Sequence, residues 1–127
     1  MKRLTVALLL TGAACAGNPS TMGLYTPIPQ PDAYQAIERK VTDLGWTVLR
    51  SDTAGGLILA ERVADTAGQK EELRITVVPD ATGVTRLEIT PSKVLPATND
   101  RPIRRVAASG KTSADAHAIL NLFMKAR

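Results

Sequence analysis

Hydrophobic positions between residues 32 and 63 predict a helix that is followed by two strands. Tyr34, Ile37, Val41 and Leu44 recur at steps of three and four residues, and this spacing places all four on one face of a helix. Polar and charged side chains fill most of the positions between them. We therefore expect an amphipathic helix whose apolar face packs against a sheet.

Residues with marked end preferences stand at both ends of this helix. Asp32 precedes Gln35 by three positions, so Asp32 is the expected N-cap. Gly45 stands where a left-handed residue ends a helix, because glycine has no Cβ to clash there. Trp46 follows directly and is predicted to be a main core residue, beside Ile37, Val41 and Phe123. Because only 3% of the residues are aromatic, the rest of the core is expected to be mainly Val, Ile, Leu and Ala.

Four runs of strand length follow one another through the middle of the chain. They cover residues 46–49, 57–63, 72–78 and 84–90, and glycine-containing turns or polar loops separate them. Apolar and polar residues alternate in the last two runs, which is typical of strands with one buried face. Pro91 is expected to end the fourth strand. The short connections favour an antiparallel meander.

A second amphipathic helix is predicted over residues 112–127. Thr112 and Asp115 resemble a capping pair at its start, and its apolar stripe consists of Ala116, Ile119, Leu120 and Phe123. We predict an α+β fold of two layers over residues 32–127, a four-stranded antiparallel meander with both helices on one face. The opposite face is expected to be wet, with Arg74, Thr76, Arg86 and Glu88 on it.

Composition and charge are those of an ordinary globular chain. The 127 residues indicate one domain, with 44% hydrophobic and 22% charged residues. The formal charge is +4, from 16 basic and 12 acidic residues, and without Lys2 and Arg3 it falls to 14 − 12 = +2. A nucleic-acid-binding face needs a denser basic surface than this, so we predict no nucleic-acid partner.

Residues 1–14 are typical of an export signal. Lys2 and Arg3 supply the positive start, residues 4–10 are apolar except for Thr5, and small residues follow. The apolar run is far shorter than the roughly 20 residues that span a bilayer. A permanent transmembrane helix is therefore not expected.

Cys15 is the only cysteine, so a disulfide within the chain is impossible. Its place after small residues at the end of an apolar run resembles the lipobox of bacterial lipoproteins, although Gly12 stands where that family prefers leucine. The resemblance implies that Cys15 carries a diacylglycerol and fatty acids such as palmitate. Ala16 in the next position implies sorting to the outer membrane. The alternative is cleavage after Ala16, at an A-x-A pattern.

Residues 15–31 are predicted to be a proline-rich tether behind the anchor cysteine. The four prolines are Pro19, Pro27, Pro29 and Pro31, and such composition favours extended chain that could hold a domain roughly 40 Å from a membrane. Met22, Leu24 and Tyr25 form an apolar patch inside this segment. We expect the patch to dock on the domain itself, with a partner protein as the alternative.

The order of elements resembles the helix-grip domains of the outer-membrane assembly lipoprotein BamC. In those domains a helix also ends at a Gly-aromatic pair, as at Gly45 and Trp46, and leads through a glycine turn into strands. The resemblance covers residues 33–63. It implies an interaction role in the bacterial envelope, by analogy of fold alone.

Residues suited to catalysis or metal binding are few. His117 is the only histidine, and no second histidine or cysteine accompanies it to bind a metal. Gly55 and Gly56 indicate a hairpin turn rather than a nucleotide loop. Glu71 and Glu72 are neighbours on a strand, so they would point to opposite faces. We predict no enzyme activity, metal or cofactor, and an unfamiliar enzyme site around His117 is the most remote hypothesis.

The strongest surface feature is the basic segment that contains Arg101, Arg104 and Arg105. Its guanidinium groups are candidates for binding lipid phosphates or an acidic partner, and a solvated loop is the simpler interpretation. Ile103 and Val106 would add apolar contacts.

Two functions from different classes follow from these features. The first is a non-enzymatic envelope lipoprotein, a tethered interaction or assembly module that Cys15 anchors to the periplasmic face of the outer membrane. The second is a soluble periplasmic or secreted domain, released after Ala16, that binds a small ligand between its sheet and helices.

Overall fold

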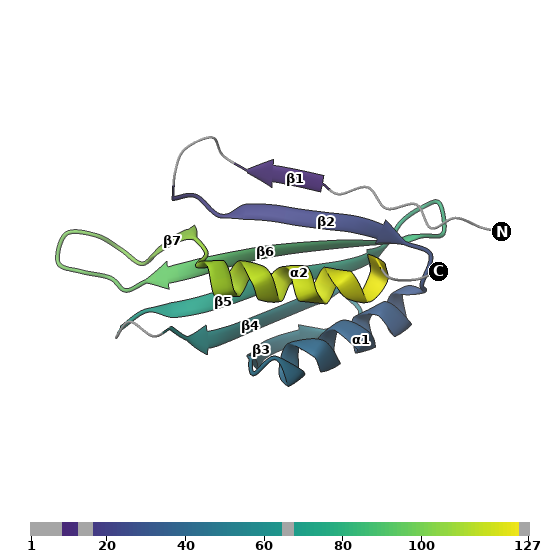
Figure 1. Ribbon diagram of the computed structural model, residues 1–127, viewed down its shortest axis with the longest axis horizontal. Helices are drawn as coiled ribbons and strands as arrows, with labels where there is room; N and C mark the ends of the chain where they lie inside the picture. Colours follow the sequence, from purple (N-terminus) through teal and green to yellow (C-terminus); the bar gives the residue numbers. More distant parts are fainter. Residues whose placement is uncertain (1–8, 13–16, 65–67, 125–127) are drawn as a thin grey trace.

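The fold was obtained as a computed structural model that describes residues 9–12, 17–64 and 68–124, with side chains from residue 17 onward. A single antiparallel sheet carries two helices on one face (Figure 1). The strand order is β1-β2-β6-β5-β4-β3, with β7 paired to β6. The elements are β1 (Leu9–Gly12), β2 (Ser20–Thr26), α1 (Gln30–Asp43), β3 (Thr47–Asp52), β4 (Leu57–Val63), β5 (Lys70–Pro79), β6 (Thr85–Leu95), β7 (Arg104–Ala107) and α2 (Gly110–Met124).

The predicted α+β class and the antiparallel meander are confirmed. Strands β3 to β6 are neighbours in chain order, and both helices pack side by side on the same face. The prediction of four strands is wrong, because β1 and β2 extend the sheet beyond β6 and β7 pairs with the end of β6. Strand β2 pairs with residues far from it in the chain, β7 follows a loop without periodicity, and β1 lies in the segment interpreted as an export signal.

The prediction that residues 15–31 form an extended tether is wrong for residues 20–26, because these residues form strand β2. Met22 and Leu24 of β2 are 7% and 0% exposed, and β2 pairs with β6 from Met22↔Ile89 to Thr26↔Thr85. Gly23 lies so close to β6 that a Cβ would meet the carbonyl oxygen of Leu87. The prediction that the apolar patch docks on its own domain is thereby confirmed for Met22 and Leu24.

The predicted export segment lies largely outside the described residues. Within it, only residues 9–12 are described, and they form β1, which pairs antiparallel with β2 from Leu9↔Gly23 to Gly12↔Ser20. Cys15 lies outside the described residues.

The core fills the space between the sheet and the helices. The predicted anchors Trp46, Ile37, Val41 and Phe123 are all buried there. Strands contribute alternate residues, such as Leu73, Ile75 and Val77 of β5. On the opposite face Arg74 and Arg86 are exposed, and Thr76 and Glu88 are half-buried, so the predicted wet face is confirmed.

The ends of α1 match the prediction only on the carboxyl side. Gly45 has φ +93°, and the N–H of Trp46 donates to the carbonyl of Val41 over 3.2 Å, which is the left-handed ending expected. The helix begins earlier than predicted, at Gln30, and Asp32 lies in its first turn rather than at the cap. Pro31 fits this turn, because its missing N–H would have no helical partner there.

Strand β6 passes through Pro91, which does not end it as predicted. On the side of β6 away from β5, residues 85–89 pair with β2 and residues 92–95 pair with β7. Pro91 therefore lies in the gap between two strands, where the missing N–H interrupts no ladder.

Candidate functional site

A cluster of charged side chains lies at the start of α2, against the core-facing surface of β4 and β5. The guanidinium of Arg62 stands 4.2 Å from the ring centroid of Trp46. Its Nη1 donates to Asp115 Oδ2 over 2.8 Å, and its Nη2 lies 3.4 Å from Glu71 Oε1. Arg62 thus joins two strands to one helix through a cation–π contact and two ion pairs.

Asp115 binds other members of this cluster and does not cap the start of α2. Its Oδ2 also accepts a hydrogen bond from Trp46 Nε1 over 3.0 Å. The residue that caps α2 is Ser109, whose Oγ accepts from the N–H of Thr112 over 3.3 Å. The predicted pairing of Thr112 with Asp115 is therefore corrected: Thr112 is buried and Asp115 holds the indole and Arg62.

Glu71 completes the cluster from β5. Ser109 Oγ donates to its Oε2 over 2.6 Å. Burial raises the pKa of the Glu71 carboxyl, but hydrogen bonds from Ser109, Thr112 and Arg62, with the charge of Arg62, outweigh it and lower the pKa below its ordinary value. A carboxylate with a lowered pKa is a weak general base at neutral pH, so the contact with Ser109 has the character of a structural hydrogen bond.

Sequence reasoning missed Arg62 and considered Glu71 only as a catalytic carboxylate, although a signal for their burial was present. Arg62 continues the core-facing series Ile58 and Ala60 of β4, and Glu71 stands two residues before Leu73 on β5. Strand alternation therefore places both charges on the buried face, where a charge needs a partner.

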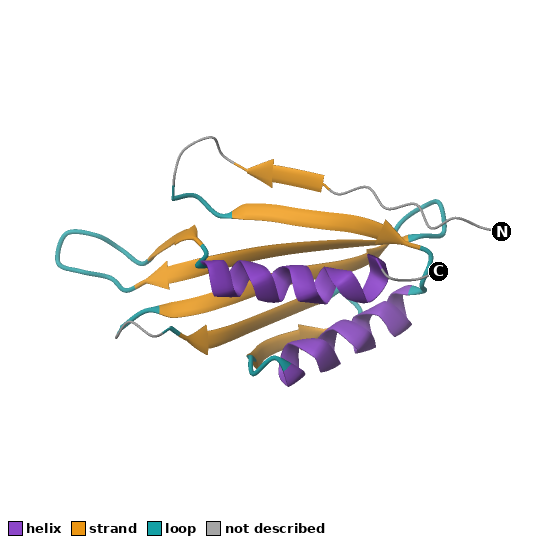
Figure 2. Cartoon of the chain, viewed as in Figure 1, coloured by secondary structure: helices purple, strands orange, loops and turns teal. Residues whose placement is uncertain are grey.

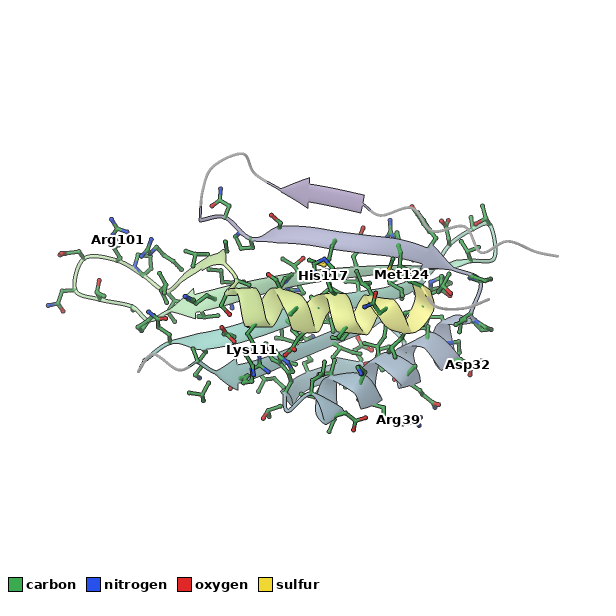
Figure 3. All side chains as sticks on the ribbon, viewed as in Figure 1. Asp32, Arg39, Arg101, Lys111, His117 and Met124 are labelled. Carbon is green, nitrogen blue, oxygen red and sulfur yellow. The ribbon has the colours of Figure 1, made fainter. Side chains whose placement is uncertain are left out.

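A cleft of about 360 Å³ opens beside this cluster, and eight residues line it: Arg62, Val63, Ala64, Gln69, Glu71, Lys93, Ser109 and Lys111. Lys93 stands directly across from Glu71 on β6, and Lys111 lies in the first turn of α2 (Figure 3). The cleft therefore adds two cations to the rim of the buried cluster.

The three predicted arginines do not form one cluster. Arg105 binds Glu72 with two hydrogen bonds, from Nε over 2.8 Å and from Nη2 over 3.2 Å, and these bonds with the charge of Glu72 raise the pKa of Arg105. Arg104 precedes Arg105 on β7 and points to the other face of the strand. Arg101 is exposed in the β6–β7 loop, far from the sheet (Figure 3).

These residues nevertheless share one end of the molecule with Gly17, which follows the predicted anchor cysteine by two positions. The N–H of Ala107 donates to the carbonyl of Gly17 over 2.7 Å. The loop of residues 96–103 projects beyond the sheet at this end (Figure 2). We call this region the basic end and define it by Gly17, Val63, Lys93, residues 96–104 and Lys111.

His117 is exposed on α2, and its Nδ1 lies 2.9 Å from the carbonyl oxygen of Ser113. Asp115 binds Arg62 and Trp46 rather than His117, so these two residues of α2 form no acid–base pair. Among the described residues, no group of three His, Cys, Asp or Glu side chains is placed to hold a metal ion.

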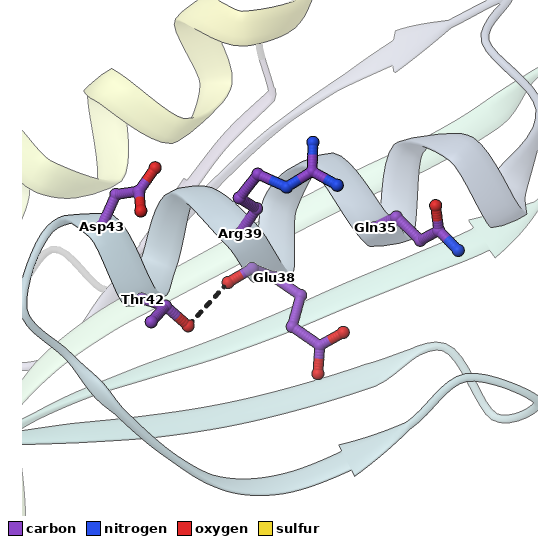
Figure 4. Close-up of a pocket in the computed structure, with 5 residues that line it drawn as sticks. All are labelled: Gln35, Glu38, Arg39, Thr42 and Asp43. Carbon is purple, nitrogen blue, oxygen red and sulfur yellow. Dashed lines mark hydrogen bonds between the residues drawn. The ribbon is translucent and has the colours of Figure 1, made fainter.

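A second depression, of about 350 Å³, lies on the outer surface of α1 (Figure 4). Gln35, Glu38, Arg39, Thr42 and Asp43 line it, and the hydroxyl of Thr42 donates to the carbonyl of Glu38 over 3.0 Å. All five residues belong to one exposed helix face, and core side chains occupy the space between sheet and helices. The depression on α1 therefore lies outside the layer where a ligand pocket was the alternative expectation. The cleft beside Arg62 opens at the end of that layer, between the core-facing surface of β4 and β5 and the start of α2.

Comparison with known proteins finds no matching family model, no matching curated protein and no matching solved structure. In the described part of the chain, no helix is long and apolar enough to cross a membrane.

Proposed function

We propose that this chain is a non-enzymatic envelope lipoprotein, an interaction or assembly module that Cys15 anchors to the periplasmic face of the outer membrane. The export-like segment of residues 1–14 and the cysteine that follows it motivate the proposed location. The polar clusters support a scaffold rather than a reaction, because Arg62, Asp115 and Glu71 are engaged with one another and with Trp46 and Ser109.

The observation that carries the proposal is the position of β2. Strand β2 begins at Ser20 and is built into the sheet beside β6, so only residues 16–19 separate it from Cys15. An anchor at Cys15 would therefore hold the domain close to the lipid surface. Confinement of this kind raises the effective concentration of a domain near membrane-bound partners, so modest affinity suffices.

Processing at Cys15 would also expose a surface for a partner. Strand β1 belongs to the segment that processing removes, and β1 is the outer neighbour of β2. The mature sheet would then end at β2 with an unpaired backbone edge. Such an edge binds an extended strand of another protein by β-augmentation, and the β1–β2 register is the template for that pairing.

One experiment tests both the lipid anchor at Cys15 and the use of the β2 edge as a docking site. The full chain is expressed in a diderm bacterium with a photo-crosslinking phenylalanine analogue in place of Tyr25, which lies half-buried on β2. We expect a diacylated Cys15 in the N-terminal peptide by mass spectrometry, and crosslinks to a specific envelope protein.

The matched control carries the same analogue at Arg74, an exposed position on the inner strand β5. Equal crosslinking from both positions would rule out the β2 edge as the docking site. An unmodified N-terminus at Gly17 would rule out the anchor and favour a freely exported domain.

A further inference from the structure

We propose that the basic end is a membrane-facing surface that binds anionic lipid headgroups, with Ile103 entering the interfacial layer. The inference rests on the proposed anchor and adds what that anchor leaves open, namely which end of the domain faces the bilayer and which lipid charge it prefers.

The position of Gly17 determines the orientation. The hydrogen bond between Ala107 and Gly17 holds the start of the mature chain against β7. Cys15 precedes Gly17 by two residues, and two residues of extended chain span at most about 7 Å. The lipid on Cys15 would therefore enter the bilayer next to β7, and the loop of residues 96–103 projects beyond the sheet at the same end (Figure 2).

The charges at this end suit a phosphate-rich surface. Arg101 and Arg104 are exposed, and neither makes an ion pair with a described residue. Lys93 and Lys111 line the adjacent cleft. Glu72 is nearly buried and already binds Arg105, so its negative charge is compensated. Guanidinium and ammonium groups beside a membrane are attracted to anionic lipids.

The apolar side chains at this end suit the same surface. Ile103 is 59% exposed and Val63 is 76% exposed, and both stand among cations. A patch that combines exposed apolar side chains with basic residues is typical of interfacial membrane contacts. Ile103 lies between Arg101 and Arg104 in the chain, so its insertion would bring both guanidinium groups to headgroup depth.

Fluorescence labelling of the acylated protein tests the orientation. Once Cys15 is acylated, a cysteine introduced by Ala97→Cys in the β6–β7 loop is the only free thiol and accepts an environment-sensitive dye. The matched control is Ala81→Cys, an exposed alanine in the β5–β6 turn at the opposite end of the sheet. In phosphatidylglycerol vesicles we expect lipid-borne quenchers to reach the dye at position 97 and only aqueous quenchers to reach it at position 81.

Charge variants test the lipid preference without the anchor. The full chain with Cys15→Ser is measured for flotation with phosphatidylglycerol vesicles and with phosphatidylcholine vesicles. Arg101→Ser combined with Arg104→Ser should weaken binding to phosphatidylglycerol by about tenfold to thirtyfold. Arg74→Ser combined with Arg86→Ser removes the same charge from the open face of the sheet and should change binding much less.

The outcomes separate this inference from the anchor itself. An acylated protein whose dye at position 97 remains in water overturns the membrane-facing basic end and leaves the anchor intact. If Cys15 carries no lipid, the flotation of the unacylated chain with vesicles tests the inference by itself. Arginine-dependent binding to phosphatidylglycerol supports the inference, and absent binding, or equal loss in both double variants, overturns it.

Discussion

Arg62 and Glu71 are charged residues on the buried side of a sheet, and hydrogen bonds make them tolerable there. Arg62 forms ion pairs with Glu71 and Asp115 and lies over the ring of Trp46. Glu71 also accepts a hydrogen bond from the hydroxyl of Ser109. Removing one partner of such a group leaves the other buried and uncompensated. Each member of the cluster therefore matters more to stability than a surface ion pair would.

The lowered pKa of Glu71 predicts an acid-dependent loss of stability. Because its folded pKa lies below the unfolded value, the contribution is complete above the unfolded value of about 4.3 and is lost as the pH falls through the folded pKa. Glu71→Gln should cost about 1–3 kcal/mol at pH 7 and much less at pH 3. Urea unfolding of both proteins between pH 3 and pH 7 measures this.

Ser109→Ala provides the matched test, since it removes the shortest hydrogen bond to Glu71. It should cost about 1 kcal/mol at pH 7, and its cost should also shrink in acid. A difference between wild type and Glu71→Gln that stays constant over the whole pH range would contradict the role assigned to this carboxylate.

At the scale of elements, β2 begins at Ser20, five positions after Cys15, so the predicted tether contains a strand of the sheet. Its alternating residues Met22 and Leu24 lie in the core, and its backbone pairs with β6. The four prolines flank this strand without interrupting it. The segment is therefore part of the folded unit.

Leu24→Ala tests whether β2 belongs to the core. Because Leu24 is completely buried, the substitution should lower the free energy of unfolding by about 2–5 kcal/mol. Leu49→Ala is the control, since Leu49 also lies in a strand but is 52% exposed, and its cost should stay within about 0.5 kcal/mol. Equal effects in thermal denaturation would mean that residues 20–26 are a tether after all.

At the scale of the whole molecule, we expect a chain that begins at Gly17 to fold without β1. Strand β2 covers the outer edge of β6, and Gly17 itself bonds to β7. The loss of β1 by processing would leave these contacts in place. The basic end therefore belongs to the same folded body as the sheet.

Two truncations test this boundary. A chain that starts at Gly17 should unfold cooperatively in urea, as followed by Trp46, the only tryptophan. A chain that starts at Pro27 lacks β2 and exposes the edge of β6, so it should be unfolded or aggregated. Equal stability of the two chains would contradict the fold boundary.

Local patterns in the sequence were sufficient for much of this architecture. The spacing of Ile37 and Val41 predicted α1, and the alternation around Ile75 and Ile89 predicted two strands of the meander with their wet face. Gly45 predicted the helix ending, and the structure has it at positive φ. These features depend on neighbouring residues, so the periods of 3.6 and 2 contain the necessary information.

Only the tertiary structure determined where the distant segments meet. The pairing of β2 with β6 and the contact of Arg62 with Asp115 join residues more than fifty positions apart, and no local period encodes such a pairing. Pro91 could continue a strand only because β2 ends and β7 begins on either side of it. The predicted arginine cluster separated for a similar reason, since burial beside Glu72 engaged Arg105 and left Arg101 and Arg104 exposed.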